Sequence, residues 1–243
     1  MSKIYEALQN VHREKQGREH ADRVSTIPFA PLEPRGLGFE DQMLSLYKVI
    51  ETLLPHYSSR IVQFIGAREG EGTSTIAREF AKTAADLTAP SVLLLDADRL
   101  NHSQDRFFDM KGGMDWVNAL RYGKNIEDSF TRVGQSKLFV SGCGNSSVTT
   151  PEIFNSSFDK MCEKLRSDFD LVLVDSAPLA VSPDGLAIAS KVDGVVLVVE
   201  ADRSRWQTVR RLRDSISRVG GNILGVVFNK RRFYIPQSIY KFL

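Results

Sequence analysis

The chain has 243 residues, 42% of them hydrophobic, and a formal net charge of +2. This length and composition suffice for one large domain with a sizeable buried core. The small net charge gives no argument for nucleic acid or an anionic membrane surface as a partner. Its two cysteines lack a metal-ligand spacing, and no apolar run approaches the length of a membrane span. We therefore expect a cytoplasmic protein without a metal-cysteine framework that binds no nucleic acid.

Residues 1–22 are the first predicted element, an amphipathic helix. Its apolar residues recur at helical spacing and are Ile4, Ala7, Leu8 and Val11. This stripe could dock in the groove of a partner or pack on the body of its own domain, and the sequence leaves both open. Residues 23–39 carry Pro and Gly at short intervals and predict an extended linker.

A second amphipathic helix is predicted over residues 40–54, at the start of a domain that we expect to span residues 40–230. Its apolar face consists of Met43, Leu46, Tyr47, Ile50 and Leu53. Such a stripe is more often part of a core than an interface.

A glycine-rich turn follows the apolar run of residues 61–65 and opens a helix-like segment that ends near Leu87. Its backbone donors and hydroxyls come from Gly70, Glu71, Gly72, Thr73, Ser74 and Thr75. Glycines let N–H groups point at phosphate oxygens, and the helix dipole adds positive potential. This order of apolar run, glycine-rich turn and helix predicts a phosphate-binding loop. In such loops a Lys precedes the Ser or Thr that ligates Mg²⁺. Here Thr73 takes the lysine position and Ser74 keeps the hydroxyl.

Two apolar runs, residues 92–95 and 171–174, end in carboxylates. A fully apolar run indicates a strand buried on both faces of a parallel sheet, and its carboxyl end faces the ligand crevice. Carboxylates beside a phosphate loop suit Mg²⁺ coordination and polarisation of a nucleophile. We therefore expect Asp96, Asp98 and Asp175 in the site. Alternatively, Asp98 could cap a helix and Asp175 could simply bond Ser74.

Strand-like and helix-like segments alternate from Arg60 to Phe228, including one predicted helix over residues 152–168. This alternation predicts a doubly wound, mostly parallel α/β sheet with right-handed crossovers. Basic residues crowd residues 203–232. They could form a solvated helix face or a surface for phosphate or a partner.

The motifs resemble those of the bacterial tyrosine kinases (BY-kinases), which regulate capsule and exopolysaccharide synthesis and export. The family's loop, Pro-Gly-Glu-Gly-Lys-Ser-Thr, is similar to residues 69–75, and its apolar-Asp-x-x-Pro motif is matched by residues 174–178. Its apolar-Asp-x-Asp-x-Arg motif is matched at both acidic positions, but Leu100 holds the arginine position and Arg99 stands one step early. The likeness covers roughly residues 39–230 and the first eight residues.

The resemblance implies a P-loop NTPase fold of the partition-ATPase-like class that binds ATP or ADP with Mg²⁺. It implies that Asp96 is a base or metal-side carboxylate with Asp98 beside it, and that Ser74 and Asp175 hold the metal. It further implies an adenine-side role for Asn229. The tail, residues 231–243, would carry the phosphorylation sites, Tyr234 and Tyr240.

Arg68 stands where the related partition and septum-positioning ATPases carry a second lysine that reaches across a dimer. Its guanidinium could replace the missing charge, or it could pair with Glu69 or Glu71 in solvent. The family's self-assembly motif, Glu-x-x-Arg-x-x-Arg, has Met43 and Leu46 at its arginine positions here. A homo-oligomer is therefore left open.

Backbone donors do not depend on a lysine, so we expect nucleotide binding to be weakened while phosphoryl transfer is weak or lost. The function expected from the resemblance is regulation of exopolysaccharide or capsule assembly. Its partner would be a membrane chain-length or polysaccharide export protein that recruits the chain to the inner membrane. Two alternatives remain, an active tyrosine autokinase or ATPase of the same pathway and a partition-type positioning ATPase.

Overall fold

The structure of the chain, a computed structural model, describes residues 25–27, 39–55, 58–87, 91–110, 113–144 and 148–231. The predicted N-terminal helix with Leu8 lies outside the described residues, as do Tyr234 and Tyr240. Within the described ranges, the helices are too short or too polar to span a membrane.

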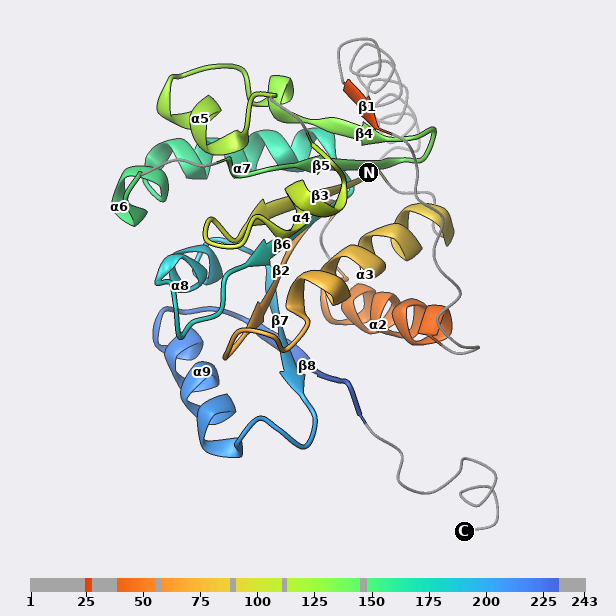
Figure 1. Cartoon of the computed structure of the whole chain (residues 1–243), viewed down its shortest axis with the longest axis vertical. Helices are drawn as coiled ribbons and strands as arrows, with labels where there is room; N and C mark the ends of the chain where they lie inside the picture. Colours follow the sequence, from red (N-terminus) through yellow and green to blue (C-terminus); the bar gives the residue numbers. More distant parts are fainter. Residues whose placement is uncertain are drawn as a thin grey trace, which may run out of the picture.

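One sheet of eight strands runs through the molecule (Figure 1). The strands are β1 (Ser25–Ile27), β2 (Arg60–Gly66), β3 (Val92–Ala97), β4 (Thr131–Val133), β5 (Leu138–Ser141), β6 (Leu171–Ser176), β7 (Gly194–Glu200) and β8 (Ile223–Asn229). Their spatial order is β1-β4-β5-β3-β6-β2-β7-β8. Among the described pairings all are parallel except β4 with β5, so the predicted doubly wound, mostly parallel sheet is confirmed.

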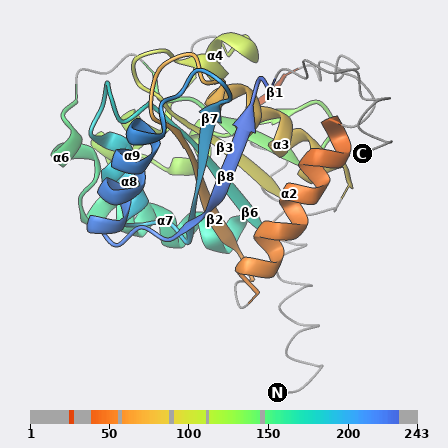
Figure 2. The ribbon, with the colours of Figure 1, turned by 90° about the horizontal axis from the view of Figure 1, so that it is seen from below.

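Helices cover both faces of this sheet. They are α2 (Phe39–Leu53), α3 (Thr73–Leu87), α4 (Ser103–Phe107), α5 (Trp116–Arg121), the 3₁₀ turn η1 (Ile126–Ser129), α6 (Thr150–Ile153), α7 (Ser156–Asp168), α8 (Asp184–Ala189) and α9 (Trp206–Arg218). Figures 1 and 2 show α2 and α3 on one side of the sheet and α7, α8 and α9 on the other.

Alternate residues of the central strands face the two helical layers. Val62 and Phe64 of β2 join the core under α2 and α3, where Phe64 contacts Phe80 with ring centroids 5.5 Å apart. Ile61 joins the core under α5 and α7, and Ile65 joins the core under α9. A strand covered on both faces must be apolar at nearly every position, which explains the continuous apolar runs.

Two local predictions needed correction. The helix predicted over residues 152–168 is two helices, because Asn155 caps α7 by accepting a hydrogen bond from the Ser157 N–H (2.8 Å). Leu53, predicted on the apolar face of α2, is 48% exposed, whereas Met43 and Ile50 are buried. The short strand β1 lies within the predicted extended linker and pairs in parallel with β4.

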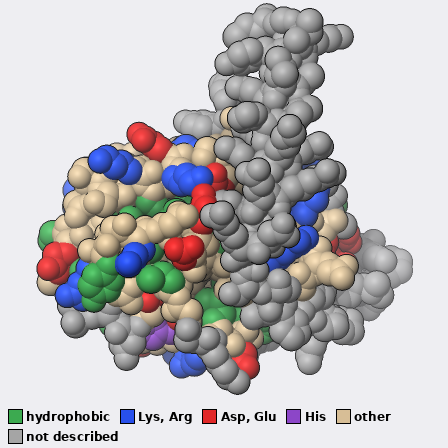
Figure 3. Space-filling view, turned by 90° about the horizontal axis from the view of Figure 1, so that it is seen from above, with side chains coloured by type: hydrophobic (Ala, Val, Ile, Leu, Met, Phe, Trp, Pro, Cys, Tyr) green, Lys and Arg blue, Asp and Glu red, His purple; other side chains and the backbone are tan. Residues whose placement is uncertain are grey.

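Basic side chains of α9 are exposed to solvent. Arg210 and Arg213 are exposed and form ion pairs with Asp214 at 3.8 and 2.7 Å. Figure 3 shows basic and acidic side chains interspersed over one face of the molecule, in keeping with the small net charge. Exposed pairs of this kind contribute little to stability, about 0–1 kcal/mol each.

Candidate nucleotide-binding site

The glycine-rich loop joins the end of β2 to the start of α3. Gly70 and Gly72 have φ angles of 83° and 88°, a left-handed backbone that favours glycine. The buried carboxylate of Glu71 turns back into the loop. It accepts hydrogen bonds from the backbone N–H groups of Ala67 (2.6 Å) and Arg68 (3.0 Å). The loop is therefore held in its curled shape by its own acidic side chain.

The helix α3 begins at the position where the lysine is missing. The N–H groups of Thr73, Ser74 and Thr75 lie in its first turn, where backbone donors lack an intrahelical acceptor and suit an anion. Thr73 is buried, and its Oγ1 lies 2.7 Å from the point where a Cβ on Gly66 would stand. A neutral hydroxyl directed into the loop thus replaces the expected ammonium group.

The two strand-end carboxylates meet across β3 and β6. Asp96 and Asp175 are register partners in adjacent parallel strands, and both are fully buried. Burial, and then the charge of Asp175, raise the pKa of Asp96 well above its ordinary value. Burial likewise raises the pKa of Asp175 to about 6, against the opposing effect of polar contacts with Gln104 and Ser74. A cation or another opposite charge that arrives beside the pair would favour the ionised carboxylates and lower both pKa values.

The Asp175 carboxylate fits a hard divalent cation. Its Oδ2 accepts a hydrogen bond from Gln104 Nε2 (2.8 Å), whereas its Oδ1 is buried without a hydrogen-bond partner among the described residues. The Ser74 hydroxyl contacts the same carboxylate. Mg²⁺ takes oxygen ligands of these two kinds. Ser74 and Asp175 would hold the ion, which when bound supplies charge stabilisation to the phosphates.

Gln104, at the start of α4, connects both carboxylates to the loop. Its backbone N–H donates to Asp96 Oδ2 (2.9 Å). Its side-chain amide donates to the Ser74 carbonyl (3.0 Å) as well as to Asp175. Its Oε1 accepts from Arg78 Nη1 (3.2 Å). Sequence reasoning missed Gln104 because α4 has five residues, too few to show a helical period.

Asp98 has a structural role in the turn after β3. Its Oδ1 accepts from the backbone N–H groups of Leu100 (3.2 Å) and Asn101 (3.1 Å). Arg99 is engaged elsewhere, with Nε and Nη2 at 2.8 and 2.7 Å from Asp184 Oδ2. Leu100, at the position of the family's arginine, is 58% exposed. A catalytic role for Asp98 remains a proposal.

Arg68 extends over the outside of the loop towards α9. Its Nη2 lies 3.4 Å from Thr208 Oγ1. In the described ranges no ion pair joins Arg68 to Glu69 or Glu71. The guanidinium is therefore near the loop but directed away from its interior.

Two consecutive residues at the end of β8, Asn229 and Lys230, contact the loop from the other side. Asn229 Nδ2 donates to the Glu71 carbonyl (2.8 Å), and Lys230 Nζ donates to the Gly70 carbonyl. Lys230 Nζ also lies 3.4 Å from Glu200 Oε2. An ammonium group thus contacts the loop although the loop's own lysine is absent. The sequence showed Lys230 only as one of many basic residues, since nothing local indicates this contact.

Replacing Gly72 by alanine should open the site, because Asn229 Nδ2 occupies the space that a Cβ would need. Gly70→Ala is the matched control, since Gly70 has a similar φ but open space at its Cβ. The control should cost roughly 1–2 kcal/mol of unfolding free energy for its left-handed backbone. Gly72→Ala should cost about 1 kcal/mol more, through the lost hydrogen bond to Glu71, and should weaken nucleotide binding further. If chemical denaturation shows equal losses of unfolding free energy for Gly70→Ala and Gly72→Ala, the contact between Asn229 and the loop does not contribute to stability.

Comparison with known proteins supports the kinase resemblance. The tyrosine-protein kinase CpsD of Streptococcus agalactiae is 29% identical over 174 residues, 71% of this chain and 76% of that protein. The succinoglycan biosynthesis transport protein ExoP of Rhizobium meliloti is 28% identical over 225 residues, 88% of this chain and 28% of that protein. No family model matches the chain.

Solved structures show the same fold. The VpsO kinase domain has a TM-score of 0.67 at 24% identity, covering 81% of this chain and 100% of that one. The cell division ATPase MinD of Pyrococcus furiosus has a TM-score of 0.62 at 17% identity, covering 76% of this chain and 79% of that one. These likenesses show the doubly wound α/β fold that the chain shares with both structures. In sequence, the chain is similar to the bacterial tyrosine-protein kinases.

Proposed function

We propose that the chain is a kinase-like P-loop protein that binds ATP or ADP with Mg²⁺ and regulates exopolysaccharide or capsule biosynthesis and export. Its phosphoryl transfer is weak or lost. The observation that carries the proposal is Thr73. This neutral residue stands at the lysine position of a loop that retains its glycines, Gly70 and Gly72, and the hydroxyl of Ser74. The names of CpsD and ExoP support the pathway.

Binding and catalysis depend differently on the missing lysine. Backbone donors at the start of α3 and the pair of Ser74 and Asp175 suffice to hold phosphate and a cation. Charge that develops in the transition state needs preorganised stabilisation, and losing one such contact costs on the order of 10²–10³ in rate. Binding therefore persists where fast transfer does not.

The test of this proposal is ATP turnover and autophosphorylation by the wild-type chain and by Thr73→Lys under saturating nucleotide. We expect the variant to be faster by roughly 10²–10³, the value of one preorganised electrostatic contact. A wild-type rate that Thr73→Lys does not raise, and that Asp96→Asn abolishes, would establish the alternative of an active autokinase.

That alternative assigns Arg68 the role of the lysine. Because Arg68 extends towards Thr208, away from the loop interior, a contribution would have to reach the site of a second protomer. Under our proposal Arg68→Ala leaves the residual turnover unchanged, as does the control Arg210→Ala on the exposed face of α9. If Arg68→Ala removes a turnover that rises with protein concentration, a rescue in trans is established and our proposal fails.

The partner we propose is a membrane chain-length or polysaccharide export protein. The match to ExoP supports this proposal. The segment similar to this chain makes up 28% of the length of ExoP, a protein named for succinoglycan biosynthesis transport. The predicted helix of residues 1–22 offers an apolar stripe for a groove. We expect Leu8→Asp to reduce co-purification with such a protein and to leave nucleotide binding intact. The control is Leu100→Asp, which alters an exposed apolar residue of the domain. A lower melting temperature in Leu8→Asp would instead place the helix in the core.

A further inference from the structure

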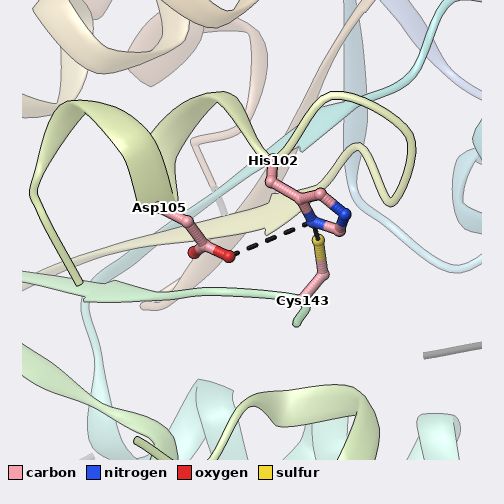
Figure 4. Close-up of side chains that lie close together, drawn as sticks. All are labelled: His102, Asp105 and Cys143. Carbon is pink, nitrogen blue, oxygen red and sulfur yellow. Dashed lines mark hydrogen bonds and ion pairs between the residues drawn. The ribbon is translucent and has the colours of Figure 1, made fainter. Parts of the chain in front are cut away.

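Three side chains with metal-binding atoms meet beside the nucleotide site (Figure 4). His102 precedes α4, Asp105 lies on it, and Cys143 follows β5. His102 Nδ1 lies 3.2 Å from Cys143 Sγ and 4.0 Å from Asp105 Oδ2. The three ligand atoms all lie within 4.8 Å of one another. Since 41 positions separate His102 from Cys143, no local spacing marks the cluster.

The distances are close to those of a coordination sphere. Ligand atoms that lie about 2.0–2.3 Å from a tetrahedral zinc ion are separated from each other by roughly 3.3–3.8 Å. Closing the observed separations, 3.2 and 4.0 Å from His102 Nδ1 and at most 4.8 Å for the third pair, onto an ion requires side-chain movements of up to about 1 Å. Imidazole, thiolate and carboxylate together suit Zn²⁺, whereas Mg²⁺ takes oxygen ligands.

The Asp105 carboxylate also lacks one expected contact. Among the described residues its Oδ1 is buried without a hydrogen-bond partner, and its Oδ2 is the oxygen that faces His102. The carboxylate is held against Gly142, where a Cβ would clash with it. A buried carboxylate oxygen without a partner is costly unless a cation or a donor satisfies it.

We propose that His102, Asp105 and Cys143 form a zinc site with an open fourth position. The side chain of His102 is 24% exposed, so the ion has access from solvent and a water can complete its coordination. The site would join the turn after β3 to the end of β5. Gln104, which orders Asp96 and Asp175, lies between two of the ligands in that turn. Zinc would therefore stabilise the arrangement of the nucleotide site, a role that the proposed function does not include.

Cobalt titration of the full chain, after removal of metal with a chelator, tests the site directly. We expect one equivalent of Co²⁺ to produce a thiolate-to-cobalt charge-transfer band that Zn²⁺ abolishes. Cys143→Ser should lose the band. Cys162→Ser should keep it, because this second buried cysteine lies on α7. The histidines outside the cluster, His12, His20 and His56, offer no thiolate and cannot produce the band.

A second variant keeps the test decisive if Cys143→Ser does not fold. His102→Asn removes the imidazole and suits the left-handed backbone there (φ 46°), which asparagine tolerates well. It should fold, lose the cobalt band and lose the rise in melting temperature that Zn²⁺ produces in the wild-type chain. Absence of the band from the wild-type chain, or its persistence in His102→Asn, would overturn the proposal.

Discussion

Thr73→Lys is expected to tighten binding of Mg-ATP by about tenfold to a hundredfold. A hydrogen bond to a charged group contributes roughly 1.5–3 kcal/mol, which corresponds to that range of affinity. The loop is prepared for the added charge, because Glu71 holds its curl and Gly70 and Gly72 keep the left-handed backbone. Calorimetric titration of the wild-type chain and the variant measures the difference.

The control is Thr73→Met, which adds a side chain of similar reach without a charge. It should bind no more tightly than the wild type, because the expected gain is electrostatic. A gain of equal size in Thr73→Met would assign the effect to shape. No gain in either variant would show that the loop no longer accepts phosphate at this position.

Asp175→Asn should stabilise the fold at neutral pH by about 2–3 kcal/mol, because burial raises the pKa of Asp175 to about 6. The unfolded chain releases this proton near pH 3.9, so between about pH 4 and 6 the folded state binds more protons. In that range the carboxylate makes the free energy of unfolding fall as pH rises. The gain from Asp175→Asn should therefore grow from about pH 4 to 6 and then level off.

The same substitution should abolish the Mg²⁺ dependence of nucleotide binding, since an amide oxygen is a poorer ligand for this ion. Thermal denaturation across the pH range, with and without Mg²⁺, measures both effects. Asp214→Asn is the control, because Arg213 lowers the pKa of this exposed carboxyl and no gain in stability is expected. A variant at position 175 that loses stability at neutral pH would contradict the raised pKa.

The central part of the fold could be predicted because its signals are local. A strand between two helical layers is apolar throughout, and its carboxyl end carries the site, so Asp96 and Asp175 were expected to meet. The sheet edge was harder. β4 has three residues and pairs antiparallel with β5, and β1 lies in a segment rich in proline. Elements of this length depend on tertiary contacts that leave no period in the sequence.

The residues of the site also fall into two groups, those that local sequence signals could predict and those that they could not. The loop and its glycines were visible because backbone geometry restricts residue type there. Gln104 and Lys230 were not, since each contacts the loop across a long separation in the chain. His102 and Cys143 were missed for that reason too, and the two cysteines by themselves indicated no metal-ligand spacing. Groups assembled from distant segments need the fold before they can be recognised.

The most direct test of the account is calorimetric titration of the wild-type chain with ADP in the presence of Mg²⁺. The account predicts binding in the micromolar to millimolar range. The backbone donors at the start of α3 and the ligand pair of Ser74 and Asp175 do not require the lysine that Thr73 replaces. Binding heat that loses its dependence on Mg²⁺ in Asp175→Asn would support it. No heat and no shift in melting temperature at millimolar nucleotide would contradict it.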